Sequence, residues 1–100
     1  MENSPENEFA AEQLFVQAPE ADATLAGDRA AIFHRGTRVT LTLNATGTVL
    51  WLALAQPRRT AELVEALQAA WPALPGGVAK RDVVEFLKQV LEHGVVKKQA

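Results

Sequence analysis

Apolar and polar residues alternate strictly over residues 38–43, which is the period of a strand with one buried face. Residues 31–34 have the composition of another strand just before it, and Arg35-Gly36-Thr37 suits a tight connection between the two. The pattern predicts a β-hairpin. Further upstream, the apolar residues 14–16 can add a third extended segment.

Apolar residues then recur at helical spacing. Asn44 is placed to cap a helix over residues 45–55, which is apolar on nearly all sides and is therefore expected to be buried. A second helix is predicted over residues 60–71, with its apolar residues on one side. The loop that follows contains residues no helix is expected to cross: Pro72, Pro75, Gly76 and Gly77.

A third helix is predicted over residues 80–93, with Gly94 placed to end it. Val95 and Val96 predict a short final extended segment before the basic tail Lys97-Lys98. The order of two or three strands followed by three helices predicts an α+β fold with a small N-terminal antiparallel sheet.

The composition is that of one ordinary soluble domain, with 48% apolar and 22% charged residues among 100. The chain has no cysteine, which excludes a disulfide, a thiolate metal site and a thiol nucleophile. We find no secretory signal. No apolar run approaches the length of about 20 residues that a helix needs to span a bilayer. We therefore expect a cytoplasmic protein without a membrane partner.

Charge is distributed unevenly along the chain. Residues 1–28 carry seven acidic side chains and no basic ones, whereas residues 29–100 have a balance of +5. We expect residues 1–24 to be an acidic, flexible arm and residues 25–98 to be the domain. The arm can shield a basic surface and compete with an acidic ligand, or it can be a passive solvated tail.

The residues that usually carry catalysis are scarce. His34 and His93 lack the spacing of a metal site, Ser4 is the only serine, and tyrosine is absent. Gly76-Gly77 lacks the sequence context of a phosphate-binding loop. We expect no enzymatic activity, no catalytic residue, no metal and no cofactor.

Three segments, taken in order, resemble the PqqD family, named for pyrroloquinoline quinone (PQQ) biosynthesis. The first is Leu43-Asn44-x-Thr46 followed by Val49-Leu50-Trp51, and the second is Thr60-Ala61-Glu62-Leu63 followed by Leu67. The third runs from Val78 through Asp82-Val83-Val84-Glu85-Phe86-Leu87 to Gly94-Val95-Val96. The resemblance covers residues 25–98. The Pro-Glu pair that usually precedes the family's last strand is not evident here, which leaves the register of the first strands open.

Members of this family are also called recognition elements of RiPPs, the ribosomally made and post-translationally modified peptides. The resemblance implies a winged helix-turn-helix that binds the leader segment of a precursor peptide as an added strand. It also implies that the leader is presented to a modifying enzyme such as a radical SAM enzyme. An exposed strand edge and alternate side-chain pockets can provide this kind of binding.

The docking edge is expected at residues 38–43, with the third helix as the other wall of a groove. The apolar residues of that helix span an arc of about 160°, wider than the roughly 100° that a one-sided helix needs. Its surplus edge, Phe86 and Val90, can line the groove or can equally belong to the core. The candidate peptide-binding residues are Arg38, Val39, Thr40, Leu41, Thr42, Asp82, Glu85, Phe86, Gln89 and Val90.

The alternative is a DNA-binding winged-helix transcriptional regulator, because the same fold serves that function widely. The positive balance of residues 29–100 favours it. Against it, acidic residues alternate with basic ones along the third helix, where they would repel phosphates, and the sequence pI is about 5.6. We therefore expect a peptide partner and no nucleic acid.

Overall fold

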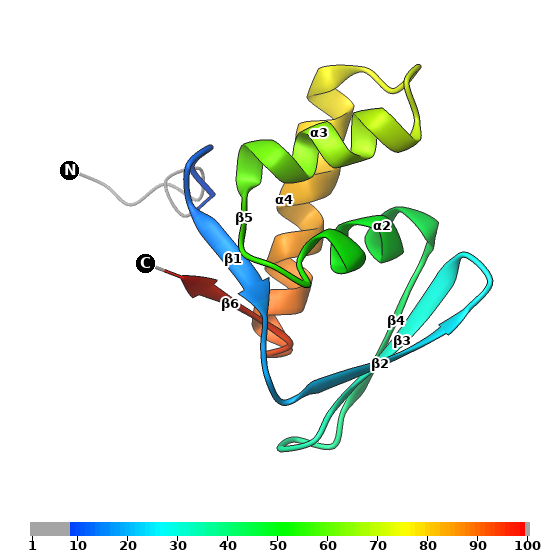
Figure 1. Cartoon of the computed structure of the whole chain (residues 1–100), viewed down its shortest axis with the longest axis vertical. Coiled ribbons are helices and arrows are strands. Elements are labelled where there is room, and N and C mark those ends of the chain that lie inside the picture. Colours follow the sequence, from blue (N-terminus) through cyan, green and yellow to red (C-terminus); the bar gives the residue numbers. More distant parts are fainter. Residues whose placement is uncertain (1–8, 100) are drawn as a thin grey trace.

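Two small antiparallel sheets and three helices make up the computed structural model, which describes residues 9–99 (Figure 1). One sheet has the strand order β2-β3-β4 and the other β5-β1-β6. The predicted α+β fold is confirmed. The strands are β1 (Leu14–Gln17), β2 (Ala21–Ala26), β3 (Arg29–His34), β4 (Thr40–Leu43), β5 (Arg58–Arg59) and β6 (Val96–Gln99), and the helices are α2 (Ala45–Ala53), α3 (Thr60–Ala70) and α4 (Gly76–Glu92).

The β2-β3-β4 sheet, which we call the wing, projects from the helices as two consecutive hairpins (Figure 1). Gly27 has a φ of +64° and begins the two-residue turn between β2 and β3, a position that favours glycine in such turns. At the other turn, the ring Nδ1 of His34 accepts the backbone N–H groups of Gly36 and Thr37 at 3.0 and 3.1 Å. The predicted hairpin is confirmed, and it continues into β2, which the sequence pattern did not predict.

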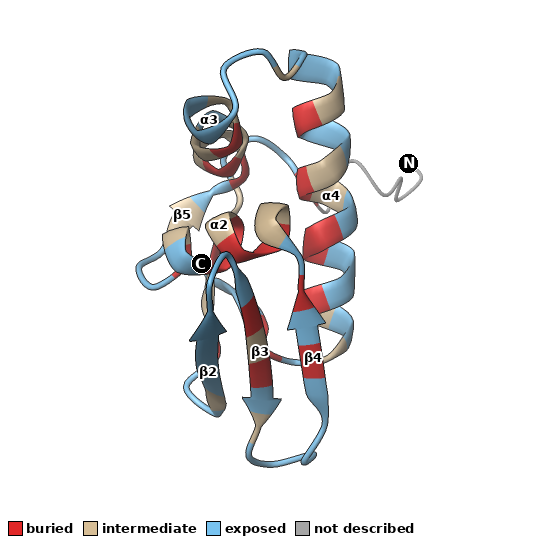
Figure 2. Ribbon diagram, turned by 90° about the vertical axis from the view of Figure 1, so that its right-hand side faces the viewer, coloured by how far each residue is buried: buried red, intermediate tan, exposed pale blue. Residues whose placement is uncertain are grey.

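One face of the wing packs on the helices and the other is open to solvent. The buried residues are Ala30 and Ile32 of β3 with Leu41 and Leu43 of β4, and register places them in adjacent pairs. Strand β2 has no buried residue, and its Leu25 is 53% exposed (Figure 2). The wing is therefore attached to the core through β3 and β4.

The second sheet has β1 as its central strand. This strand pairs with β5 on one side and β6 on the other, and Phe15 at its centre is fully buried. The expected extended segment at residues 14–16 is thus confirmed, and Lys97-Lys98 belong to a strand and are not a tail.

The expected flexible arm does not extend over residues 9–24. Phe9 belongs to the core and stacks on Phe15, while the carbonyls of Ala11 and Gln13 accept backbone N–H groups at the start of α3. The expected boundary at residue 25 falls inside β2. Residues 1–8 lie outside the described part of the chain. The acidic charge of this stretch led us to expect an arm, although the extended segment at residues 14–16 was itself predicted and is part of the folded domain.

Helix α2 begins where predicted, because Asn44 Oδ1 accepts the N–H of Gly47 at 2.9 Å. Helix α4 begins earlier than predicted, at Gly76, with Pro75 as its N-cap. Both glycines thus lie in its first turn, where the amides need no helical partner. Within residues 9–99, no helix is long and apolar enough to cross a membrane.

Candidate functional site

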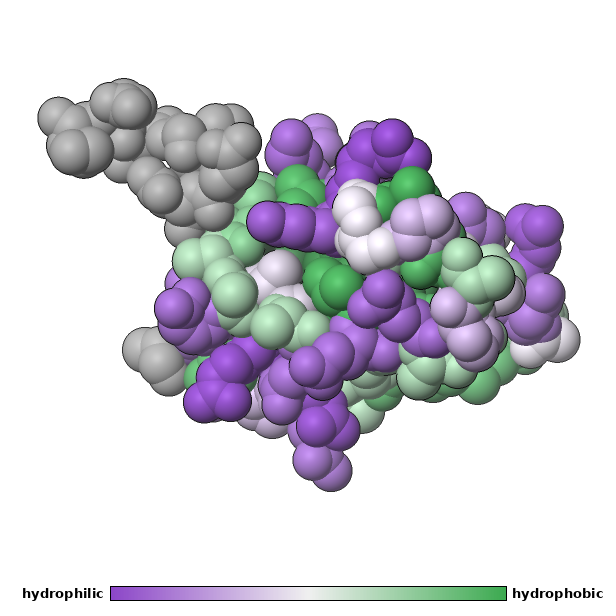
Figure 3. All heavy atoms as spheres, turned by 90° about the horizontal axis from the view of Figure 1, so that it is seen from above, coloured by the Kyte–Doolittle hydropathy of each residue, from purple (hydrophilic) through white to green (hydrophobic). Residues whose placement is uncertain are grey.

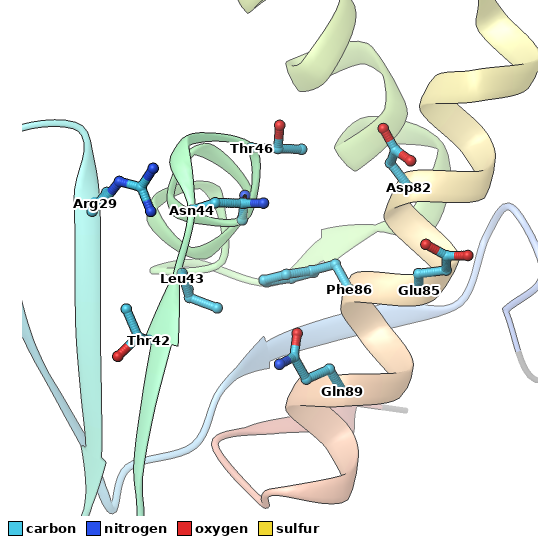
Figure 4. Close-up of a pocket in the computed structure, with 10 residues that line it drawn as sticks. Arg29, Thr42, Leu43, Asn44, Thr46, Asp82, Glu85, Phe86 and Gln89 are labelled. Carbon is cyan, nitrogen blue, oxygen red and sulfur yellow. Dashed lines mark hydrogen bonds between the residues drawn. The ribbon is translucent and has the colours of Figure 1, made fainter.

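A groove of about 420 Å³ lies between the end of β4 and one side of α4 (Figure 4). We call it the β4 groove. It receives side chains from β3, β4, α2 and α4, so four separate elements of the domain position it. The residues that line it are Arg29, Thr42, Leu43, Asn44, Thr46, Gly47, Asp82, Glu85, Phe86 and Gln89.

Strand β4 is an edge strand, because β3 is the only strand with which it pairs within residues 9–99. The N–H of His34 donates to the carbonyl of Val39, so these two residues form a hydrogen-bonded pair at the hairpin end of the β3–β4 ladder. In an antiparallel ladder, every second pair of residues is hydrogen-bonded in this way. The next such pairs are Ile32 with Leu41 and Ala30 with Leu43. The backbone groups of Thr40 and Thr42 therefore point away from β3, toward the open edge.

Helix α4 forms the wall that faces this edge. Asp82, Glu85, Phe86 and Gln89 are spaced three and four residues apart, so they share one side of the helix. The Phe86 side chain points toward Leu43, between the helix and β4, and only 6% of the residue is exposed (Figure 4). The wall therefore combines an apolar floor with two carboxylates and an amide.

The start of α2 forms the inner end of the groove. A methyl group on Gly47 would approach Leu43 Cβ to 3.3 Å and Asn44 Oδ1 to 3.4 Å, so glycine allows this turn to lie close against β4. Arg29 is the only basic residue of the lining and lies on β3, away from the α4 carboxylates (Figure 4). The groove thus has acidic side chains along the helix and a basic one at the sheet.

Five of the ten residues predicted from the sequence line this groove, namely Thr42, Asp82, Glu85, Phe86 and Gln89. The structure places Leu41 and Val90 in the core, so their side chains are not at the surface. Thr40 is on the same edge farther from α2, and Val39 and Arg38 belong to the exposed hairpin turn, where Arg38 has a φ of +66°. The predicted strand at residues 38–43 is thus two residues shorter at its start.

The other five lining residues were not predicted as site residues: Arg29, Leu43, Asn44, Thr46 and Gly47. The capping position of Asn44 was a usable signal, because it marks where β4 meets α2. No sequence signal pointed to Arg29, because β3 was expected to begin two residues later.

The groove offers an open backbone edge and alternating polar and apolar contacts. Within residues 9–99 we find no group of three histidine, cysteine, aspartate or glutamate side chains that could hold a metal ion. The arrangement is suited to holding an extended peptide.

Comparisons with known proteins agree with this geometry. The family described as coenzyme PQQ synthesis protein D (PqqD) matches residues 29–96, which confirms the resemblance seen in the sequence. A solved structure described as "TbiB1 in Complex with the TbiA(beta) Leader Peptide" is similar, with a TM-score of 0.76 and 21% identity. The alignment covers 85% of this chain and 98% of that one, so the two share their fold. None of the curated protein sequences matches the chain.

Proposed function

Because the chain belongs to the PqqD family, we propose that it binds the leader segment of a ribosomally made precursor peptide and presents it to a modifying enzyme. It acts as an adaptor and does not itself catalyse a reaction. The observation that carries the proposal is the open edge of β4 beside the β4 groove, since both are needed to bind an extended segment in a defined register.

The leader adds to the wing as a fourth strand. Its backbone pairs with the N–H and carbonyl groups of Thr40 and Thr42, which no strand among residues 9–99 occupies. These bonds depend little on the leader sequence, so they supply affinity without much selectivity. TbiB1, whose fold is similar, is described in complex with a leader peptide, which supports a leader peptide as the partner.

Selectivity comes from alternate side chains of the leader. A leader residue opposite Leu43 shares the inner face of the wing and points into the β4 groove, over Phe86. An apolar side chain fits at this position. Asp82 and Glu85 beside it favour a neighbouring leader residue with a positive charge or an N–H donor.

The family resemblance also supports a peptide-modifying enzyme, such as a radical SAM enzyme, as the second partner, and the cytoplasm as the location. The alternative of DNA binding is less well supported, because the α4 surface beside the wing carries carboxylates.

The test is a calorimetric titration of the full chain with the leader of the precursor encoded beside its gene, together with amide chemical shifts of the ¹⁵N-labelled protein. We expect saturable binding and the largest shifts at residues 40–43 and 82–89. Random duplex DNA at low salt is the control. A protein that binds DNA but not the leader would overturn the proposal, as would leader-induced shifts confined to other surfaces.

A further inference from the structure

A second depression, with a volume of about 660 Å³, lies between α3, α4 and residues 9–11. We call it the lysine face. Seen from above, from the end of the molecule where α3 lies in Figure 1, the surface shows apolar side chains among hydrophilic ones (Figure 3). Its lining consists of Phe9, Ala10, Ala11, Thr60, Ala61, Val64, Glu65, Gly76, Lys80, Val84 and Lys88.

The two depressions use different sides of α4. Lys80, Val84 and Lys88 follow one another at four-residue spacing and form a stripe along the helix. At about 100° per residue, this stripe lies roughly half a turn from the residues that line the β4 groove. Acidic and basic residues that alternate in the α4 sequence are thus separated in space, and both depressions can be occupied at once.

The lysine face has the composition of a protein-docking surface. Val64 and Val84 supply an apolar floor, and Lys80 and Lys88 flank it without an ion pair to any residue among 9–99. Glu65 is the only acidic residue of the lining. An apolar centre with a charged rim is typical of surfaces that bind a complementary segment.

Thr60, which also lines this depression, carries a buried hydroxyl group. The residue is 3% exposed, and its hydroxyl has no hydrogen-bond partner within the described part of the chain. Buried hydroxyl groups are nearly always hydrogen-bonded, because leaving one unpaired is unfavourable.

We propose that the lysine face docks an acidic amphipathic helix of the modifying enzyme, an inference that rests on the function proposed above. Lys80 and Lys88 are separated by about 12 Å along α4, so two carboxylates at a similar separation on the enzyme helix would pair with them. Apolar side chains between those carboxylates would cover Val64 and Val84. The leader and the enzyme would then contact opposite sides of α4, and neither would displace the other.

The test compares the wild type with the K80E/K88E variant and with a matched R81E/K97E variant, which makes the same charge change at exposed residues outside both depressions. Each is titrated separately with the leader and with the enzyme that modifies the cognate precursor. We expect K80E/K88E to weaken enzyme binding at least tenfold and to leave leader affinity within twofold. R81E/K97E should leave both affinities within about twofold to threefold.

Loss of enzyme binding in both variants, or in neither, would overturn the lysine face as the docking surface. A wild-type protein that does not bind the leader would instead refute the proposed function. Failure of the docking surface and failure of the proposed function can therefore be told apart. Equal thermal midpoints of the variants establish that folding is retained. A wild-type protein that dimerises or binds duplex DNA through Lys80 and Lys88, without binding the enzyme there, would also overturn the proposal.

Discussion

The two sheets of this molecule have the same number of strands, but only in the wing does an edge strand line one of the two depressions described above. In the β5-β1-β6 sheet the central strand is β1, which is paired on both sides, and Phe15 is fully buried. In the wing, β2 has no buried residue and β4 has an open edge beside a groove. We infer that the first sheet holds the ends of the domain together, while the second is available for a partner.

This difference separates stability from binding within one small domain. A change in the β5-β1-β6 sheet should act on folding, and a change at the outer edge of the wing should act on the leader. The predictions below test that separation, beginning with the largest expected effect.

Truncation of a buried aromatic side chain should have the largest effect on stability. Phe15→Ala should lower the free energy of unfolding by about 3–5 kcal/mol, because it leaves a cavity beside Phe9 and the helices. Phe33→Ala, in the wing and 37% exposed, should cost about 1 kcal/mol or less. Urea denaturation measures both, and equal losses would contradict the division between the sheets.

Phe86 of α4 belongs both to the hydrophobic core and to the β4 groove, so it tests stability and binding together. Phe86→Ala should cost about 2–4 kcal/mol of stability, because the side chain is nearly buried, and should also weaken leader binding. Leu87→Ala is the matched control, since Leu87 is fully buried and does not line the β4 groove. Thermal denaturation should show a similar loss of stability in both variants. Leader titration below the melting range should show a loss of affinity in Phe86→Ala alone.

Proline at the open edge should separate binding from folding most cleanly. The Thr42 N–H points away from β3, so Thr42→Pro removes a bond to the leader and spares the ladder, whereas Leu41→Pro would break it. We expect leader affinity to fall at least about tenfold. Circular dichroism should show a folded protein.

Ala23→Pro places the same change on the outer edge of β2, where register also directs the backbone away from β3. This control should bind the leader as the wild type does. Normal binding by a folded Thr42→Pro variant, or its loss in Ala23→Pro, would show that β4 is not the docking edge.

The smallest effect is expected from the acidic N-terminus. Deletion should stop at residue 8, because Phe9 is part of the core and the carbonyls of Ala11 and Gln13 bind the start of α3. If residues 1–8 compete with an acidic leader for a basic surface, their removal should tighten binding by under about 1 kcal/mol at low salt, and by scarcely anything near molar salt. Leader titrations at both ionic strengths measure this. Equal affinities at low salt would identify a passive tail.

The helices and the β3–β4 hairpin were predictable because each gives a long or strict pattern. Asn44 marked the start of α2, and the alternation of residues 38–43 identified the strand with the open edge. Strands β1, β5 and β6 are short and pair with partners distant in sequence, so no local pattern could reveal their sheet. For the same reason Leu41 and Val90 were expected at the site although packing against other elements buries them.

The site itself could be predicted only in part. Spacing along one helix identified Asp82, Glu85, Phe86 and Gln89, since these residues are neighbours in any α-helix. Arg29 and Gly47 join them through the tertiary fold, which spacing does not encode. The separation of charge around α4 was likewise hidden, because basic and acidic residues alternate in the sequence.

The pairing of β1 with β6 has a consequence for how the domain can be tethered. Leu14 lies opposite Gln99, and the Gln13 side chain reaches the Gln99 carbonyl, so both ends of the described chain emerge together, far from the wing (Figure 1). A linker fused at either end would therefore leave the β4 edge uncovered. In a covalent fusion to an enzyme, a short flexible linker would give a millimolar effective concentration of leader-loaded domain, so even weak docking would suffice for delivery.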